Sequence, residues 1–193
     1  MKHLKDQELM KIIQAGDHSP ASELYDRYVT RMYNFAFRFV RNAETAEDLT
    51  QEVFLKMITK AHTFKADSSL STWLFTITAN MCKDYLRKVR NHGEEETDEV
   101  LAVSPAPDED GPERRFQQTE AAEAVTTALN KLSPDMREAV ILARYGGLSY
   151  AEIATAAGCS EKAVKSRIHR AMDLMRNYLL GSAAPAAPEE TNV

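Results

Sequence analysis

The chain has 193 residues, of which 44% are hydrophobic and 27% charged, and its formal net charge is −5. This length allows one medium domain or two small ones, and the composition is that of an ordinary water-soluble protein. No run approaches the roughly 20 apolar residues that cross a bilayer. The first ten residues also lack the apolar core of a secretory signal, so we expect a cytoplasmic protein.

Apolar residues recur at every third or fourth position along most of the chain, whereas strand-like alternation is scarce. This pattern predicts an all-α fold made of two small helical domains. In the first domain, residues 1–92, it predicts helices over 4–15, 21–40, 42–62 and 71–90. In the second domain, residues 119–180, the first two predicted helices cover 119–132 and 134–145.

The third predicted helix carries a polar and acidic face opposite its apolar stripe. Four residues at positions i, i+3, i+4 and i+7 share this face: Asp48, Gln51, Glu52 and Leu55. The periodicity leaves two interpretations open, an ordinary solvated face or a docking surface for a basic partner.

A polar loop and a basic helix end follow in the first domain. The loop runs from Phe64 to Leu70, and its candidate ligand-binding residues are Phe64, Lys65, Asp67, Ser68 and Ser69. Such a cationic, hydroxyl-bearing loop could hold an unstacked base and its phosphate. In the next helix, three residues fall on one face and could contact a nucleic-acid backbone: Asn80, Lys83 and Arg87.

The negative charge of the chain is concentrated in one segment. Residues 93–113 contain nine acids and no Lys or Arg, and taking those nine charges away from the net −5 leaves +4 for the rest. The same segment holds three of the seven prolines. Like charges repel and proline removes backbone donors, so we predict a flexible acidic linker over 93–118. Residues 181–193 are predicted to form a disordered tail.

The second domain contains the spacing of a helix-turn-helix. Ser149 and Glu152 have the spacing of a capping box, which predicts the start of a short helix. Gly158 suits the left-handed residue that ends such a helix, and Ser160 can cap the next one. The sequence therefore predicts a helix-turn-helix over 149–175.

The second helix of this motif is basic, with a net charge of +3 between residues 161 and 176. Its predicted outward face carries Lys162, Lys165, Ser166, Arg167, His169 and Arg170. A solvated charged face is one interpretation. Behind a capped helix and a glycine turn, however, binding in the DNA major groove is the stronger one, because phosphates attract cations and arginine pairs with guanine.

Several motifs in this order resemble the bacterial sigma factors of the extracytoplasmic-function (ECF) type. They are AEDLTQEVF at 46–54, STWLF at 71–75, DYLR at 84–87, LSP at 132–134, GLSYAEIA at 147–154 and AVKSRIHRA at 163–171. The resemblance covers residues 4–90 and 119–180. One departure is Lys162-Ala163, where many relatives carry Gly-Thr, so the base preference of the second helix cannot be carried over.

The resemblance implies a fold, partners and roles. The first domain would dock through Asp48, Gln51 and Glu52 on the clamp helices of the largest RNA polymerase subunit. Its loop and Asn80 would capture a flipped base of the minus-ten promoter element. The second domain would contact the flap of the second large subunit and read the minus-thirty-five element. An anti-sigma factor, often tethered to the inner membrane, would hold the protein inactive in a stress or envelope response.

The sequence offers no enzymatic constellation. The histidines are scattered, no phosphate-binding glycine loop is present, and neither Cys82 nor Cys159 has a CxxC partner. We therefore expect a non-enzymatic protein without cofactor, metal or small-molecule substrate. Two other classes remain open: a regulator with an N-terminal sensor, and a helical antagonist that binds polymerase but not promoters.

Overall fold

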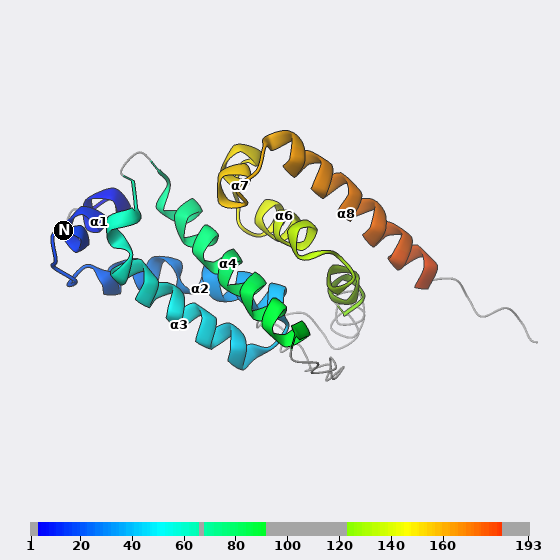
Figure 1. The fold of residues 1–193 in the computed structure, drawn as a ribbon, viewed down its shortest axis with the longest axis horizontal. Helices are drawn as coiled ribbons and strands as arrows, with labels where there is room; N and C mark the ends of the chain where they lie inside the picture. The colour runs from blue at the N-terminus through cyan, green and yellow to red at the C-terminus, as the bar shows by residue number, and fades with distance from the viewer. Residues whose placement is uncertain (1–3, 66–67, 92–122, 183–193) are drawn as a thin grey trace, which may run out of the picture.

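The computed structural model describes residues 4–65, 68–91 and 123–182 (Figure 1). Every regular element within these ranges is helical, which confirms the predicted all-α fold. None of these helices is long and apolar enough to cross a membrane. The proposed linker, 93–118, and all of the proposed tail beyond Ser182 lie outside the described residues.

The first domain, described over residues 4–65 and 68–91, is a helical bundle with a short extra helix at one end. Its elements are α1 (Asp6–Gln14), α2 (Ala21–Val40), α3 (Ala43–Thr59), the 3-10 helix η1 (Ala61–Thr63) and α4 (Leu70–Asn91). Helices α2, α3 and α4 pack on one another, and α1 lies against α2 and η1. Phe35, Phe39 and Phe75 meet in the centre of this bundle, each at most 2% exposed.

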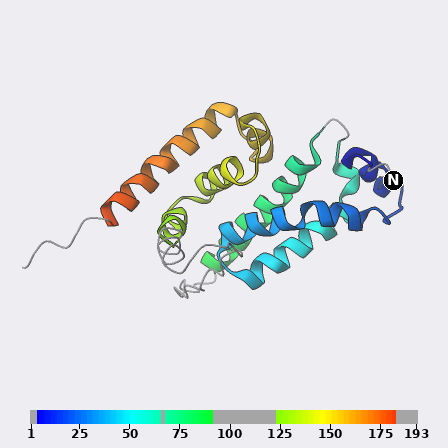
Figure 2. The ribbon, with the colours of Figure 1, turned by 180° about the vertical axis from the view of Figure 1, so that it is seen from behind.

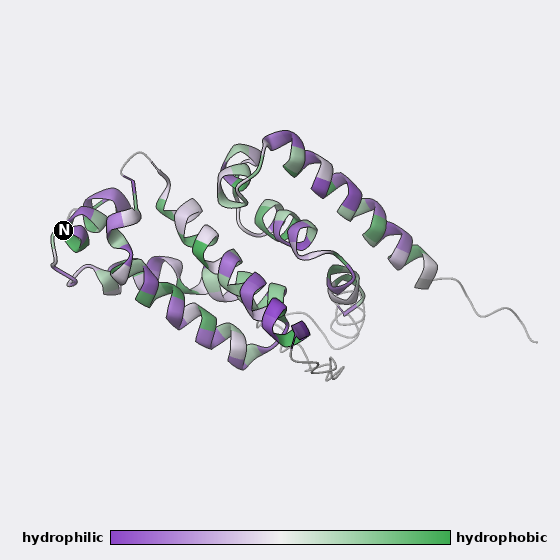
Figure 3. Cartoon of the chain, viewed as in Figure 1, coloured by the Kyte–Doolittle hydropathy of each residue, from purple (hydrophilic) through white to green (hydrophobic). Residues whose placement is uncertain are grey.

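The second domain, described over residues 123–182, has three named helices after a helical segment at 123–130. These are α6 (Pro134–Arg144), α7 (Tyr150–Ala156) and α8 (Glu161–Ser182), so α8 runs two residues into the proposed tail. Leu129, Val140 and Met175 are among the residues that form a small core between α6, α8 and the 123–130 segment. Hydrophilic and hydrophobic residues alternate along α8 (Figure 3), and four large apolar side chains of its second half are exposed: Met172, Leu174, Tyr178 and Leu180.

The two domains lie directly against each other. Helix α7 packs on α4 and α6 packs on α2, as both views show (Figures 1 and 2). The core of the first bundle continues without interruption into the second domain through Ile141, Leu142 and Ile153, which are fully buried. The structure therefore presents the two domains in a closed arrangement.

Hydrogen bonds between the domains accompany this apolar contact. Arg31 on α2 donates to the carbonyl oxygen of Gly146 at 2.7 Å, and Arg137 on α6 donates to the carbonyl oxygen of Phe39 at 2.7 Å. A side chain at Gly146 would place its Cβ only 2.7 Å from the Leu142 carbonyl oxygen, so this turn requires glycine.

Candidate nucleic-acid interface and docking surface

The predicted helix-turn-helix is confirmed by its local geometry. At the start of α7, the Glu152 backbone N–H donates to Ser149 Oγ at 3.3 Å, and the Ser149 N–H donates to Glu152 Oε2 at 2.9 Å. The Ser149 hydroxyl also donates to Glu152 Oε2 at 2.7 Å, and the hydrogen bonds from the Ser149 N–H and hydroxyl lower the pKa of the Glu152 carboxyl group. Gly158 has a φ of +60°, and Ser160 Oγ accepts from the Ala163 N–H at 3.2 Å. The chain thus turns sharply from α7 into α8.

Most of the predicted recognition residues lie on the surface of α8. Lys162, Lys165, His169 and Arg170 are exposed, and the half-buried Ser166 accepts a hydrogen bond from Arg170 at 2.9 Å. Helix α8 is the element farthest from the first domain in both views (Figures 1 and 2). This basic face is therefore accessible in the closed arrangement.

Arg167 was expected on the same outward face, and the structure corrects this. Its guanidinium donates to Asp135 Oδ2 at 3.0 Å and to Cys159 Sγ at 3.4 Å, and its side chain is 23% exposed. Position 167 follows Val164 by three residues and precedes Ala171 by four, and both of these are fully buried. Arg167 consequently borders the inner stripe of α8 and ties this helix to the start of α6.

The four residues predicted to share a face of α3 do so. Asp48, Gln51, Glu52 and Leu55 are all exposed, and Leu55 is 62% exposed although it is apolar. Glu52 forms an ion pair with Lys56 at 2.7 Å along the helix. Helix α3 packs on α2, α4 and η1, and it lies on the side of the first domain away from the second domain (Figure 1).

The loop residues divide into anchors and accessible groups. Phe64 was expected to contact DNA, but its side chain is 5% exposed and packs edge-on against Trp73 at 5.5 Å between ring centroids. An aromatic ring at this point is stabilised by burial, so Phe64 anchors the loop instead. Lys65 is exposed and Ser68 and Ser69 are half-buried, while Asp67 lies outside the described residues.

The three predicted basic-face residues of α4 also differ in accessibility. Asn80 and Arg87 are exposed, although Arg87 forms an ion pair with Asp84 at 2.8 Å. Lys83 donates instead to Glu138 of the second domain at 2.9 Å. In the closed arrangement Lys83 is therefore not free to contact DNA, because a partner 55 residues away occupies its ammonium group.

The sequence interpretation missed the residues that join the domains. Glu138 is one of them: it is fully buried, and burial raises the pKa of its carboxyl group. The only signal in the sequence is its position one helical turn before Leu142, on the apolar side of α6. Within the described ranges, Cys82 and Cys159 are free, and no cluster of His, Cys, Asp and Glu could hold a metal ion.

Comparison with known proteins gives the family of the chain. The model of sigma-70 region 2 matches residues 24–92, and that of sigma-70 region 4 matches residues 122–175. The RNA polymerase sigma-H factor of Pseudomonas aeruginosa is 32% identical over 91% of this chain and 94% of its own. The ECF RNA polymerase sigma-E factor of Escherichia coli K12 is 31% identical over 91% of this chain and 95% of its own.

Solved structures have the same fold. The sigma factor RpoE from Bartonella quintana, in complex with the anti-sigma factor NepR, has a TM-score of 0.65 and 29% identity over 84% of this chain and 98% of its own. CnrH, in complex with the cytosolic domain of CnrY, has a TM-score of 0.68 and 23% identity over 93% of this chain and 99% of its own. The chain belongs to the ECF sigma factors, and it is a sigma factor for promoter-specific transcription initiation.

Proposed function

We propose that this sigma factor works through three surfaces, each on a different helix or loop. The α3 face of Asp48, Gln51, Glu52 and Leu55 docks on the core polymerase. The α8 face of Lys162, Lys165, Ser166, His169 and Arg170 reads the upstream promoter element. The loop at Lys65, Ser68 and Ser69, with Asn80 and Arg87 on α4, holds the melted minus-ten element. The observation that carries this proposal is that the α3 residues and most of the α8 residues are exposed, on helices that lie on opposite sides of the closed molecule (Figure 1).

The α3 face has the chemistry of a docking surface. Two carboxylates and an amide precede Leu55 on the same face, so a partner can contribute cations beside an apolar contact. Burying the exposed Leu55 side chain would contribute roughly 1.5–3 kcal/mol, and the surrounding charges would orient the partner. A basic, partly apolar helical surface, such as that of the polymerase clamp, fits these requirements.

The α8 face has the chemistry of a major-groove reader. Cations at Lys162, Lys165 and Arg170 can neutralise phosphates, and Arg170 can donate two hydrogen bonds to a guanine edge. His169, whose Nε2 lies 3.4 Å from Asp173 Oδ2, is on the same exposed side. The net charge of +3 in this part of α8 favours this face for DNA, even though the whole chain is acidic.

The promoter geometry requires the two domains to separate. The two promoter elements are about 25 base pairs apart, which is roughly 85 Å at about 3.4 Å per pair. Domains that share a continuous hydrophobic core cannot reach both elements at once. Residues 92–122 would span up to roughly 100 Å if fully extended, so the covalent connection is long enough. Tethering both domains to one polymerase then raises the effective concentration of each for its DNA element.

No covalent step is assigned to this protein. Base capture only has to offset the few kcal/mol lost when a base leaves the stack, and binding in a polar loop can supply that. The protein would work in the cytoplasm, where RNA polymerase and promoter DNA are found. We also propose control by an anti-sigma factor, because the related Bartonella quintana RpoE was solved with such a partner. A stress or envelope response is the corresponding physiological role.

Run-off transcription tests the proposal. Purified core RNA polymerase is mixed with this protein and with genomic fragments, and transcripts are compared with those from core alone. We expect new transcripts with defined starts only when the protein is present. A protein that binds core tightly but produces no transcript from any fragment would be an antagonist, and the proposed function would be wrong.

A further inference from the structure

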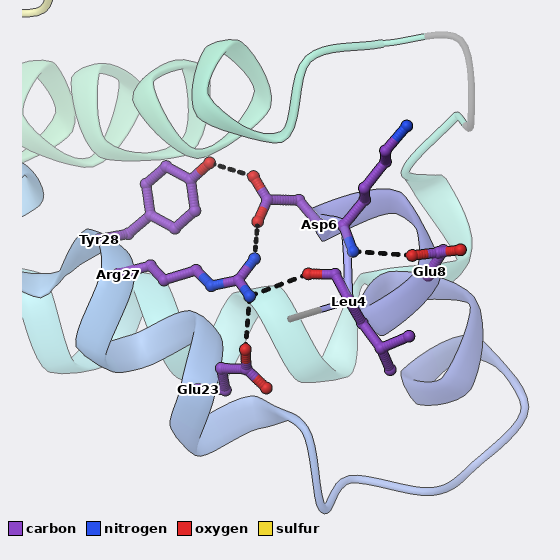
Figure 4. Close-up of polar contacts among 7 residues, drawn as sticks. Leu4, Asp6, Glu8, Glu23, Arg27 and Tyr28 are labelled. Atoms are coloured by element: carbon purple, nitrogen blue, oxygen red, sulfur yellow. Dashed lines mark hydrogen bonds and ion pairs between the residues drawn. The ribbon is translucent and has the colours of Figure 1, made fainter. Parts of the chain in front are cut away.

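Helix α1 lies before residues 24–92, the part of the chain that matches the sigma-70 region 2 model. The first turn of α1 is held to α2 by hydrogen bonds. Arg27 on α2 donates to Asp6 Oδ1 at 2.6 Å and to the Leu4 carbonyl oxygen at 2.9 Å (Figure 4). The Tyr28 hydroxyl donates to the other Asp6 oxygen, and Glu23 accepts from Arg27. The start of α1 therefore has a fixed position on the bundle.

The apolar side of α1 is buried in the core of the first domain. Leu9, Met10 and Ile13 are at most 2% exposed. Side chains that are packed this closely allow little movement of the helix that carries them. Helix α1 is thus a rigid support rather than a loosely attached segment.

The last residue of α1 reaches the base of the loop. Gln14 Nε2 donates to the Ala61 carbonyl oxygen at 2.8 Å and to the Phe64 carbonyl oxygen at 2.9 Å. Ala61 begins η1, and Phe64 is the residue at which the chain leaves η1 for the loop. One amide group thereby fixes two backbone carbonyls just before Lys65.

The loop is fixed at its other end as well. Leu70 is 1% exposed, and Ser69 Oγ accepts from the Thr72 N–H at the start of α4 at 3.4 Å. The Phe64 ring is held against Trp73 of the same helix. The two ends of the loop are therefore set by buried side chains, and Gln14 adds a restraint on the direction in which the backbone departs.

We propose that Gln14 is a positioning residue for base capture by this loop. By holding the Phe64 carbonyl, it fixes the backbone from which Lys65 departs before DNA arrives. A loop base that is already fixed loses less conformational entropy on binding, so the captured base is held more tightly. This inference rests on the proposed function of the loop, and it extends that function to a helix that the family model does not cover.

The test replaces the amide donor and keeps the helix. Gln14→Glu has nearly the same shape, but its carboxylate cannot donate to the two carbonyls. Gln14→Ala removes the group without adding charge. Lys11→Gln is the matched control, because it changes the charge of α1 by the same amount as Gln14→Glu at an exposed position one turn earlier.

The main readout is the binding of a short, fluorescent single-stranded oligonucleotide to the holoenzyme. The oligonucleotide carries the minus-ten non-template sequence of a promoter that run-off transcription has mapped. Because two modest hydrogen bonds are lost, Gln14→Glu and Gln14→Ala should weaken binding roughly 3- to 10-fold. Core affinity and upstream-element binding should not change. Lys11→Gln should bind the oligonucleotide as the wild type does.

A second readout needs no DNA. Trp73 is the only tryptophan of the chain and contacts Phe64, so its emission reports the position of the loop base. We expect both Gln14 variants, but not Lys11→Gln, to make Trp73 more accessible to acrylamide.

Three results would overturn the inference. Gln14→Glu could bind the oligonucleotide as well as Lys11→Gln does, which would contradict the role of Gln14 and leave the proposed function of the loop standing. Core affinity could fall as much as oligonucleotide binding, which would indicate a general structural role. A wild-type holoenzyme that does not bind the oligonucleotide at all would instead contradict the proposed function of the loop, and the inference with it.

Discussion

Lys83 on α4 and Glu138 on α6 form an ion pair of 2.9 Å that joins the two domains. The Glu138 side chain is 1% exposed, and within the described residues its second oxygen, Oε1, has no hydrogen-bond partner. A buried carboxylate held by a single charged partner is costly to keep in place. The Glu138 carboxylate therefore favours opening of the domain contact in which it is buried. It also occupies the ammonium group of Lys83, a residue that the sequence assigns to DNA binding.

Removing the lysine should open the molecule. In Lys83→Met the Glu138 charge stays buried without its partner, and we expect the domain contact to lose roughly 1–3 kcal/mol. This loss is smaller than the loss on removing one partner of a fully buried ion pair, because Lys83 is 20% exposed and the domains can part. Small-angle scattering should show a larger radius of gyration. Lys88→Met, an exposed change on the same helix, should leave the radius unchanged.

The domain contact should depend on pH through Glu138. Burial raises the pKa of this carboxyl above its ordinary value of 4.5, while Lys83 acts in the opposite direction. Since the pKa is higher in the closed form, protonation stabilises closure. Closure should be strongest below about pH 4.5 and weaken as the pH rises through the raised pKa.

The scattering radius measured against pH checks this prediction. Glu138→Gln should abolish this component of the pH dependence, and Lys83→Met should move it to higher pH. Asp135 and Arg167 also act on the Glu138 carboxyl and are unchanged in both variants. A pH dependence that is identical in Glu138→Gln and in the wild type would assign the effect to other groups.

The recognition face of α8 can be tested at one arginine. Arg170→Ala should cost about 1–3 kcal/mol of upstream-element binding if its guanidinium contacts a base. Fluorescence anisotropy with a duplex carrying the element measures this. The control Arg176→Ala removes a cation six residues further along α8 that lies 3.7 Å from Asp173, and it should weaken upstream-element binding less. Equal losses in the two variants would mean that only the general positive charge matters.

The α3 face can be tested by reversing one charge. Asp48→Lys should weaken core docking about tenfold or more, because a cation would then face a basic partner. Binding of the second domain to upstream-element DNA should not change. Glu44→Lys makes the same charge change at an exposed position one turn earlier and should have a smaller effect. If DNA binding falls together with core binding, the variant has lost its fold.

The local features of this fold could be predicted because neighbouring residues determine them. The capping box at Ser149 and Glu152 and the left-handed Gly158 follow from short-range hydrogen bonds and backbone sterics, and both are present. The exposed face of Asp48, Gln51, Glu52 and Leu55 likewise follows from helical periodicity. These are the parts of the site for which the sequence pattern is sufficient.

Contacts between distant segments could not be predicted in the same way. Lys83 has the composition of a DNA contact, but its partner Glu138 is 55 residues away, and only the packing of α6 on the first domain brings them together. Arg167 sits at the edge of the buried stripe of α8, where a small rotation of the helix decides between solvent and Asp135. The hydrogen bonds of Gln14 join positions 47 and 50 residues apart.

The most direct test of the central claim maps transcript starts on one promoter that the holoenzyme uses. The upstream element and the minus-ten element are mutated separately, and run-off products are compared with those of the intact promoter. If the protein reads promoters with two separated domains, each mutation should reduce transcription at the same start site. Transcripts that are indifferent to both mutations would contradict this account.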